Sequence, residues 1–119
     1  MKSLARIRKR LGRCYELAFK VIFQEADAER FTLVHGRVRP GFVHEHQVSG
    51  ERIGHAWIET AIDKVFDPVS GEHTSFDQYQ RLTRATVDRR YSRAEALRLV
   101  ACTGHYGPWL EDEIRQSLK

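Results

Sequence analysis

The sequence has few of the residues that would mark a specialised class of protein. Only two of its 119 residues are cysteine, Cys14 and Cys102, and nothing marks them as a disulfide pair. Proline and glycine are too few and too scattered to form a flexible linker, and no internal repeat is present. A disulfide-stapled scaffold and a repeat array are therefore excluded, and a reducing, cytoplasmic location is the simplest expectation.

A long uninterrupted hydrophobic run is also missing. The most apolar stretch, residues 14–23, contains Glu16 and Lys20, so it predicts neither a signal peptide nor a membrane span. Hydrophobic residues make up 41% of the chain and charged residues 30%, which is the balance of an ordinary globular domain. A chain of this length suits a single domain, 1–119, whose core needs no disulfides.

Positive charge is concentrated near the N-terminus, in a chain whose formal net charge is +4. The basic residues of this cluster are Lys2, Arg6, Arg8, Lys9, Arg10 and Arg13. One interpretation is the solvated face of a short amphipathic helix over residues 2–11, with Leu4, Ile7 and Leu11 as its inner stripe. The other is a surface for weak contact with nucleic acid or anionic lipid.

Hydrophobic periodicity predicts a central helix over residues 14–26. Its polar positions Glu16, Lys20 and Gln24 form one narrow stripe, so we expect other elements to pack around most sides of the helix. Ser92 and Glu95 have the spacing of a capping box, and Gly104 suits the end of the helix that they begin.

The remaining elements follow from alternation and turn residues. Strands are expected at 30–40, 53–62, 64–67 and 83–92, a turn at Asp63-Lys64, a helical turn at 75–82 and a last helix after Pro108. Within the second strand, Ile53, His55, Trp57 and Glu59 share one face. The order of elements predicts an α+β domain with a mainly antiparallel sheet.

Three residues in this arrangement suit nucleophilic catalysis: Cys14 at a helix N-terminus, His55 on a strand and Asp67 at the end of the next strand. The positive end of a helix dipole stabilises a thiolate, and Arg10 and Arg13 could add to that effect. An imidazole can take the proton of the thiol, and a carboxylate can orient the imidazole. His55 and Asp67 become neighbours if their strands form a hairpin in the required register.

The segments around these residues, "GRCYELA", "GHAWIE" and "VFDPV", resemble the three signature segments of the transglutaminase-like branch of papain-like cysteine enzymes. The same order and spacing are similar to small peptidases that remove leader segments from ribosomal peptides. No glutamine matches the one that precedes the cysteine in papain, so the second oxyanion donor is unassigned. The matching positions are Gly12, Cys14, Ala18, His55, Trp57, Ile58, Glu59, Phe66, Asp67 and Pro68.

The resemblance implies a papain-like fold, with the central helix packed on a small antiparallel sheet. It implies acyl transfer from an amide of a protein or peptide substrate through a thioester on Cys14, with His55 as base and acid and Asp67 as its orienting group. No cofactor is implied. Hydrolysis is favoured over transfer to an amine, since so short a chain leaves little room for a second acceptor site. The alternative is a catalytically silent module that binds a protein or nucleic acid through its basic N-terminus.

Plainer interpretations exist for each of these residues. Cys14 could fill the core, His55 could be an ordinary strand histidine, and Asp67 could serve only the turn before Pro68. Trp57 is expected to pack beneath the site, and Glu59 suits a surface position. A metal site formed by His44, His46, His55 and Cys14 is the remaining alternative, although its spacing matches no familiar zinc template.

Two further features lie near the C-terminus. Cys102 follows Leu97, Leu99 and Val100 in a predicted helix, so we expect it to pack in the core. The cluster "TGHYGPW", residues 103–109, is interpreted either as a rigid turn between two helices or as a loop at the rim of a cleft.

Overall fold

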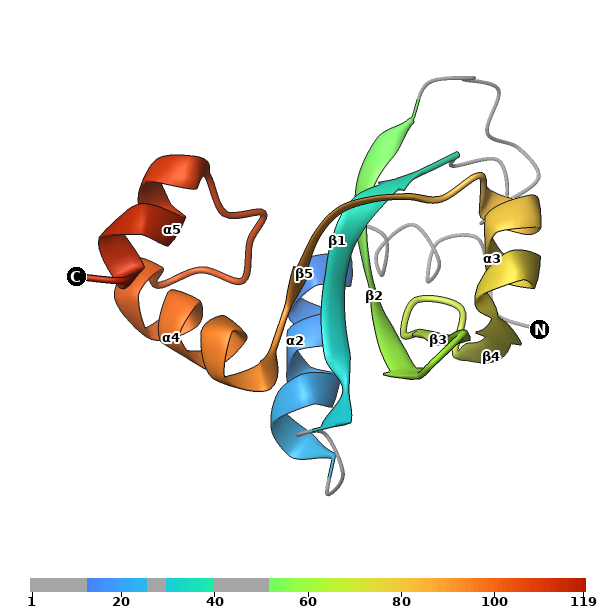
Figure 1. Cartoon of the computed structure of the whole chain (residues 1–119), viewed down its shortest axis with the longest axis horizontal. Coiled ribbons are helices and arrows are strands. Elements are labelled where there is room, and N and C mark those ends of the chain that lie inside the picture. The colour runs from blue at the N-terminus through green and yellow to red at the C-terminus, as the bar shows by residue number, and fades with distance from the viewer. Residues whose placement is uncertain (1–12, 26–29, 40–51) are drawn as a thin grey trace.

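The computed structural model of the chain describes residues 13–25, 30–39 and 52–119 (Figure 1). These residues form four helices and one antiparallel sheet with the strand order β4-β3-β2-β1-β5. The helices are α2 (Cys14–Gln24), α3 (Phe76–Thr83), α4 (Arg93–Thr103) and α5 (Glu111–Ser117). The strands are β1 (Thr32–Val38), β2 (Ile53–Ala61), β3 (Lys64–Asp67), β4 (Glu72–Ser75) and β5 (Thr86–Tyr91). The predicted α+β class and antiparallel sheet are confirmed.

Helices cover both faces of the sheet (Figure 1). On one face α2, α4 and α5 pack over Leu33 and Ile58, and on the other α3 packs over Val34 and Trp57. Because both faces are covered, the middle of β2 is buried continuously from His55 to Ile58 instead of in alternation. The predicted helix over 2–11 lies outside the described residues, and so do residues 40–51 between β1 and β2.

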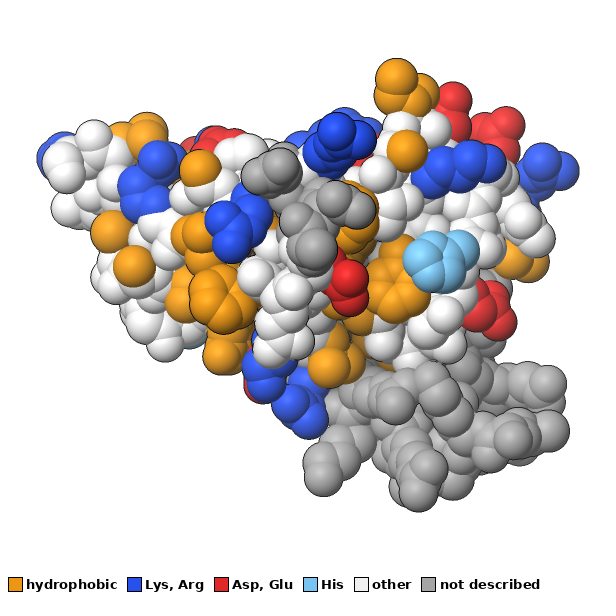
Figure 2. Space-filling view, turned by 90° about the horizontal axis from the view of Figure 1, so that it is seen from below, with side chains coloured by type: hydrophobic (Ala, Val, Ile, Leu, Met, Phe, Trp, Pro, Cys, Tyr) orange, Lys and Arg blue, Asp and Glu red, His pale blue; other side chains and the backbone are white. Residues whose placement is uncertain are grey.

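Helix α2 begins at Cys14, as predicted, and ends two residues earlier than expected. Glu16 lies on its polar stripe between Arg13, at 3.0 Å, and Lys20, at 2.7 Å. Most of the apolar surface of α2 is covered, as predicted, and the exception is Phe23 near the C-terminal end, whose side chain is 54% exposed and stacks on Phe19. Figure 2 shows hydrophobic side chains that reach the surface of one face between groups of Lys and Arg.

The hairpin between β2 and β3 turns one residue earlier than predicted. Ala61 pairs with Lys64, so the two turn residues are Ile62 and Asp63 and Lys64 already belongs to β3. Asp63 adopts a φ of 60°, in the left-handed region that aspartate tolerates better than most residues.

Strand β3 ends at Asp67, as predicted, but the chain then returns as β4, which the sequence did not predict. Asp67 pairs with Glu72, and Gly71 adopts the positive φ of 75° that the intervening turn requires. Four mostly polar residues, Glu-His-Thr-Ser, are too few and too uniform to show alternation. Helix α3 then begins at Phe76 behind Ser75, whose side chain accepts a hydrogen bond from the Gln78 N–H.

Helix α4 confirms its predicted ends, with a reciprocal capping box between Ser92 and Glu95 and a left-handed Gly104. The prediction that Cys102 packs in the core is wrong, because this side chain is exposed. The buried stripe of α4 passes through Ala96 and Leu99, and one turn later it reaches residue 103 instead of 102. Among the described residues no helix is long and apolar enough to cross a membrane.

Candidate active site

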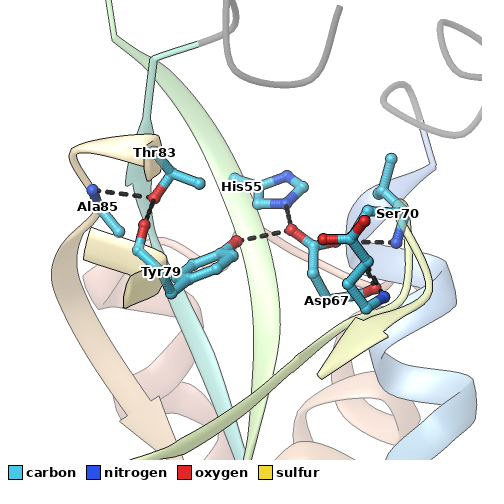
Figure 3. A network of polar contacts seen from close by, with 8 residues as sticks. His55, Asp67, Ser70, Tyr79, Thr83 and Ala85 are labelled. Carbon is cyan, nitrogen blue, oxygen red and sulfur yellow. Dashed lines mark hydrogen bonds and ion pairs between the residues drawn. The ribbon is translucent and has the colours of Figure 1, made fainter. Parts of the chain in front are cut away.

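The structure brings His55 and Asp67 into a buried pair, as the sequence predicts. His55 Nε2 lies 2.9 Å from Asp67 Oδ2, and the two residues are 0% and 3% exposed. The Tyr79 hydroxyl donates to the same oxygen at 2.6 Å, and the Val69 N–H donates to Oδ1 at 2.8 Å (Figure 3). Asp67 therefore serves the turn with one oxygen and holds His55 with the other.

A β-bulge in β2 decides on which face Asp67 lies. Ala61 pairs with Lys64 beside the turn, but the register shifts between Glu59 and Ala61. Thr60 is thus an extra residue on β2 with no counterpart on β3. A shift of one residue moves every following side chain of β3 to the opposite face relative to β2.

Beyond this bulge Ile58 pairs with Phe66, which places Asp67 opposite Trp57. Trp57 and His55 share a face of β2 because they are two residues apart, so Asp67 comes to the face of His55. Without the extra residue Asp67 would lie opposite Ile58, on the face covered by α2. The register that the sequence left open is therefore set by one inserted residue.

The electrostatics of the pair follow from burial and hydrogen bonding. Burial alone would lower the pKa of His55, but the hydrogen bond to Asp67 and the interaction with Cys14 raise it to about 9. Burial alone would raise the pKa of Asp67, but the bonds to His55 and Tyr79 bring it below its ordinary value. Burial, followed by the carboxylate of Asp67, raises the pKa of Tyr79, so the hydroxyl remains a donor. The structure favours a protonated imidazole beside a carboxylate.

Cys14 lies at the N-terminus of α2, 2% exposed and near enough to His55 to contribute to the raised imidazole pKa. The remaining ring nitrogen, Nδ1, is buried and has no hydrogen-bond partner among the described residues. Among the described residues no side chain caps α2, so the backbone N–H groups of its first turn are available as hydrogen-bond donors. Burial alone would also fit a core cysteine, and its interaction with the buried ring of His55 is what distinguishes Cys14.

The expected help from nearby arginines is only partly present. Arg13 is bound to Glu16 through two hydrogen bonds, of 3.1 and 3.0 Å, so much of its charge is neutralised by that carboxylate. Arg10 lies outside the described residues. The positive end of α2 and the imidazolium of His55 are therefore the positive groups that remain beside Cys14.

The other residues of the resembling segments have structural places. Trp57 is fully buried between His55, at 6.3 Å between ring centroids, and Tyr79, at 5.3 Å, as expected for a residue beneath the site. Glu59 is bound to Arg90 at 2.6 Å at the surface of the sheet. Trp57 therefore packs against the site, Glu59 belongs to the surface, and neither takes part in the Cys14–His55–Asp67 chain.

Only part of the alternative metal site lies among the described residues. His44 and His46 lie outside the described residues, and His55 is committed to Asp67. Within the described ranges no group of three or more His, Cys, Asp or Glu side chains could hold a metal ion. No set of described residues is assigned to a cofactor.

A cavity of about 610 Å³ adjoins the site on the face covered by α2. Tyr15, which follows Cys14, and Gly54, which precedes His55, both line it, although the three candidate catalytic side chains do not. A Cβ on residue 54 would lie 2.4 Å from the Tyr15 hydroxyl, so a larger residue there would displace the Tyr15 side chain. The cavity is therefore linked to the candidate catalytic residues through their nearest neighbours in the chain.

Sequence reasoning missed two elements of this site. Tyr79 lies in a segment predicted only as a helical turn, and its pattern with Phe76 and Thr83 would have indicated a buried face but not a bond to Asp67. The bulge at Thr60 has no sequence signal. Comparison with known proteins adds nothing to these assignments, because no family model, no curated protein and no solved structure matches the chain.

Proposed function

We propose that this protein is a thiol-dependent hydrolase of amide or peptide bonds, with a papain-like, transglutaminase-like arrangement of Cys14, His55 and Asp67. One observation carries the proposal: His55 is buried, bound through Nε2 to Asp67 at 2.9 Å, and close enough to Cys14 for the two side chains to interact, while its Nδ1 has no hydrogen-bond partner among the described residues. A histidine that only filled the core would not need both a buried carboxylate partner and a neighbouring thiol.

In the proposed reaction the Cys14 thiolate attacks the carbonyl carbon of an amide and forms a C–S bond. The negative charge moves to the carbonyl oxygen, where the N–H of Cys14 at the start of α2 can stabilise it. As the C–N bond breaks, His55 donates its proton to the leaving amine, and a thioester remains. Water then loses a proton to His55, attacks the thioester and releases the acid and the Cys14 thiolate.

Water is the acceptor that we favour. Transfer to an amine would require the protein to bind a second substrate in register with the thioester, whereas hydrolysis requires only one bound peptide. The cavity beside Tyr15 and Gly54 can supply that one binding site. Peptidase, amidase and deamidase activities all follow from the same steps, because they differ only in which amide is presented.

Site-resolved labelling with iodoacetamide between about pH 5 and 9 tests the proposal. Cys102 is an exposed thiol in the same molecule and therefore serves as an internal reference. We expect Cys14 to label at least about tenfold faster than Cys102 near pH 6, because His55 keeps it a thiolate there. The His55→Gln variant should lose this advantage, and His73→Gln, which alters an exposed histidine on β4, should keep it.

Labelling of Cys14 that is no faster than labelling of Cys102 at any pH, or that requires unfolding, would overturn the proposal. The same outcome would favour the alternative function, a catalytically silent module that binds a protein or nucleic acid. Binding to DNA or RNA that weakens steeply with salt would then indicate a role for the basic N-terminal residues.

A further inference from the structure

The cavity beside the candidate catalytic residues has an aromatic wall. Its centre is His35, whose ring stacks on Trp109 at 5.0 Å between centroids and meets Tyr15 and Tyr91 edge-on at 4.8 and 5.0 Å. Pro108 and the Ile114 side chain of α5 complete the apolar surface. We call the cavity lined by these residues the aromatic pocket.

His35 carries no charge in this wall. Its side chain is 5% exposed, and neither ring nitrogen has a hydrogen-bond partner among the described residues. Burial lowers the pKa of His35 to about 4, so the ring is neutral at pH 7. Placing an unpaired polar ring here costs about 1–3 kcal/mol, which a purely structural aromatic residue would avoid.

The segment "TGHYGPW" holds the far wall of the aromatic pocket. His105 Nε2 lies 2.7 Å from Glu113, its Nδ1 accepts from the Gly107 N–H at 3.1 Å, and its carbonyl accepts from Trp109 Nε1 at 3.1 Å. A Cβ on Gly107 would lie 2.7 Å from Cε1 of the His35 ring. Both interpretations of this segment apply, since it is a rigid turn and it also lines a cavity.

The rim of the aromatic pocket is charged but internally paired. Arg37 lies 3.3 Å from Asp88, and Arg89 lies 3.1 Å from Glu111. A fifth charged residue, Arg52, donates a hydrogen bond to Thr86. Because each carboxylate already has an arginine, the aromatic rings are not backed by free negative charge, and a cationic ligand would meet an excess of positive charge. A cation is therefore disfavoured, and the aromatic rings that line the interior favour an uncharged aromatic group.

We propose that the aromatic pocket is a substrate subsite and that it takes an uncharged aromatic side chain of a peptide. This inference rests on the proposed function, because Tyr15 and Gly54, which line the pocket, are the chain neighbours of Cys14 and His55. Burial raises the pKa of the Tyr15 hydroxyl to about 12, so this group stays a neutral donor at the wall of the pocket.

Binding to the full-length Cys14→Ala protein tests the pocket without requiring turnover. Protein-observed NMR would follow titration with the N-acetyl amides of tyrosine, phenylalanine, leucine, lysine and glutamate. We expect the two aromatic amides to bind roughly tenfold more tightly than leucine, with shifts centred on Gly36, Tyr91 and Trp109. Trp109→Leu should remove this preference, whereas Leu110→Ala, a change at an exposed neighbour outside the pocket, should not.

The outcomes separate this inference from the proposed function. Equal binding of all the amides, tighter binding of lysine or glutamate, or shifts located elsewhere would overturn the pocket assignment even if Cys14 labels rapidly. Aromatic binding in the pocket together with an unreactive Cys14 would overturn the proposed function and, with it, the role as a substrate subsite. If Trp109→Leu does not fold, the location of the shifts in the Cys14→Ala protein decides.

Discussion

Two buried histidines lie on neighbouring strands and differ in almost every electrostatic respect. His55 lies opposite Gly36, and His35 is the residue before Gly36, so the two rings point to opposite faces of the sheet. They are 0% and 5% exposed. His55 has Asp67 as a partner and a pKa raised to about 9, whereas His35 packs among aromatic rings without a hydrogen-bond partner among the described residues and has a pKa lowered to about 4. At similar burial, the presence or absence of a carboxylate partner determines whether the imidazole is charged near pH 7.

The comparison also predicts opposite effects of pH on stability. A raised pKa means that folded His55 holds its proton more tightly than the unfolded chain, so its contribution is full below pH 6.5 and is lost as the pH rises towards 9. A lowered pKa means that, between pH 6.5 and 4, His35 binds a proton in the unfolded chain but not in the folded protein. The stability linked to His35 is therefore full above pH 6.5 and is lost as the pH falls towards 4.

Asp67→Asn is expected to have the largest effect. It removes the charged partner of His55 and makes the surroundings of His55 resemble those of His35. Burial would then dominate, and the pKa of His55 should fall below 6.5. We expect a loss of about 3–5 kcal/mol in the free energy of unfolding. The fast labelling of Cys14 near pH 6 should disappear, and so should the decline of stability between pH 6.5 and 9.

Urea denaturation across this pH range, with NMR titration of the His55 ring, measures these effects. Asp88→Asn is the matched control, because it neutralises an exposed carboxylate bound to Arg37. A His55 ring that still titrates near pH 9 in Asp67→Asn would show that Asp67 is not the cause of the raised pKa.

Much of the site was predictable because each of its residues marks the end or face of an element. Cys14 begins an apolar helix, His55 shares a strand face with Trp57, and Asp67 precedes a proline that ends its strand. These are local signals, since periodicity and turn residues act over a few positions. Residue types and order along the chain therefore predicted which side chains could meet.

What the sequence could not predict depends on contacts between distant residues. The bulge at Thr60 is a matter of how β2 and β3 align, and both alignments keep the same residues in the same order. The neutral state of His35 depends on rings from α2, β5 and the 103–109 segment. The exposed Cys102 shows a further limit, because three apolar neighbours in sequence do not fix which side of a helix is buried.

The second-largest effect is expected from His35→Phe, which keeps an aromatic ring and removes both unpaired nitrogens. We expect the free energy of unfolding to rise by about 1–3 kcal/mol near pH 5, because the unfolded chain no longer gains a proton that the folded protein excludes. Near pH 7 the gain should be smaller. Chemical denaturation at the two pH values measures the difference.

His73→Phe is the control for His35→Phe, since His73 is an exposed histidine that also contacts an aromatic ring, Phe66. It should leave the dependence of stability on pH unchanged. An equal loss of stability on acidification in His35→Phe and in the unaltered protein would show that His35 is already paired or solvated in solution.

The smallest change is expected from Tyr79→Phe, which removes one of the two donors to Asp67 Oδ2 and keeps the ring packed on Trp57. We expect a loss of about 1 kcal/mol in the free energy of unfolding and a several-fold decrease in Cys14 labelling near pH 6, because Asp67 holds His55 less firmly. Thr83→Val is the matched control, since it removes a buried hydroxyl of the same helix that bonds only to backbone. If both variants lose stability and neither changes the pH profile of labelling, Tyr79 supports only the packing of α3. If only Tyr79→Phe changes that profile, its hydroxyl positions the Asp67–His55 pair.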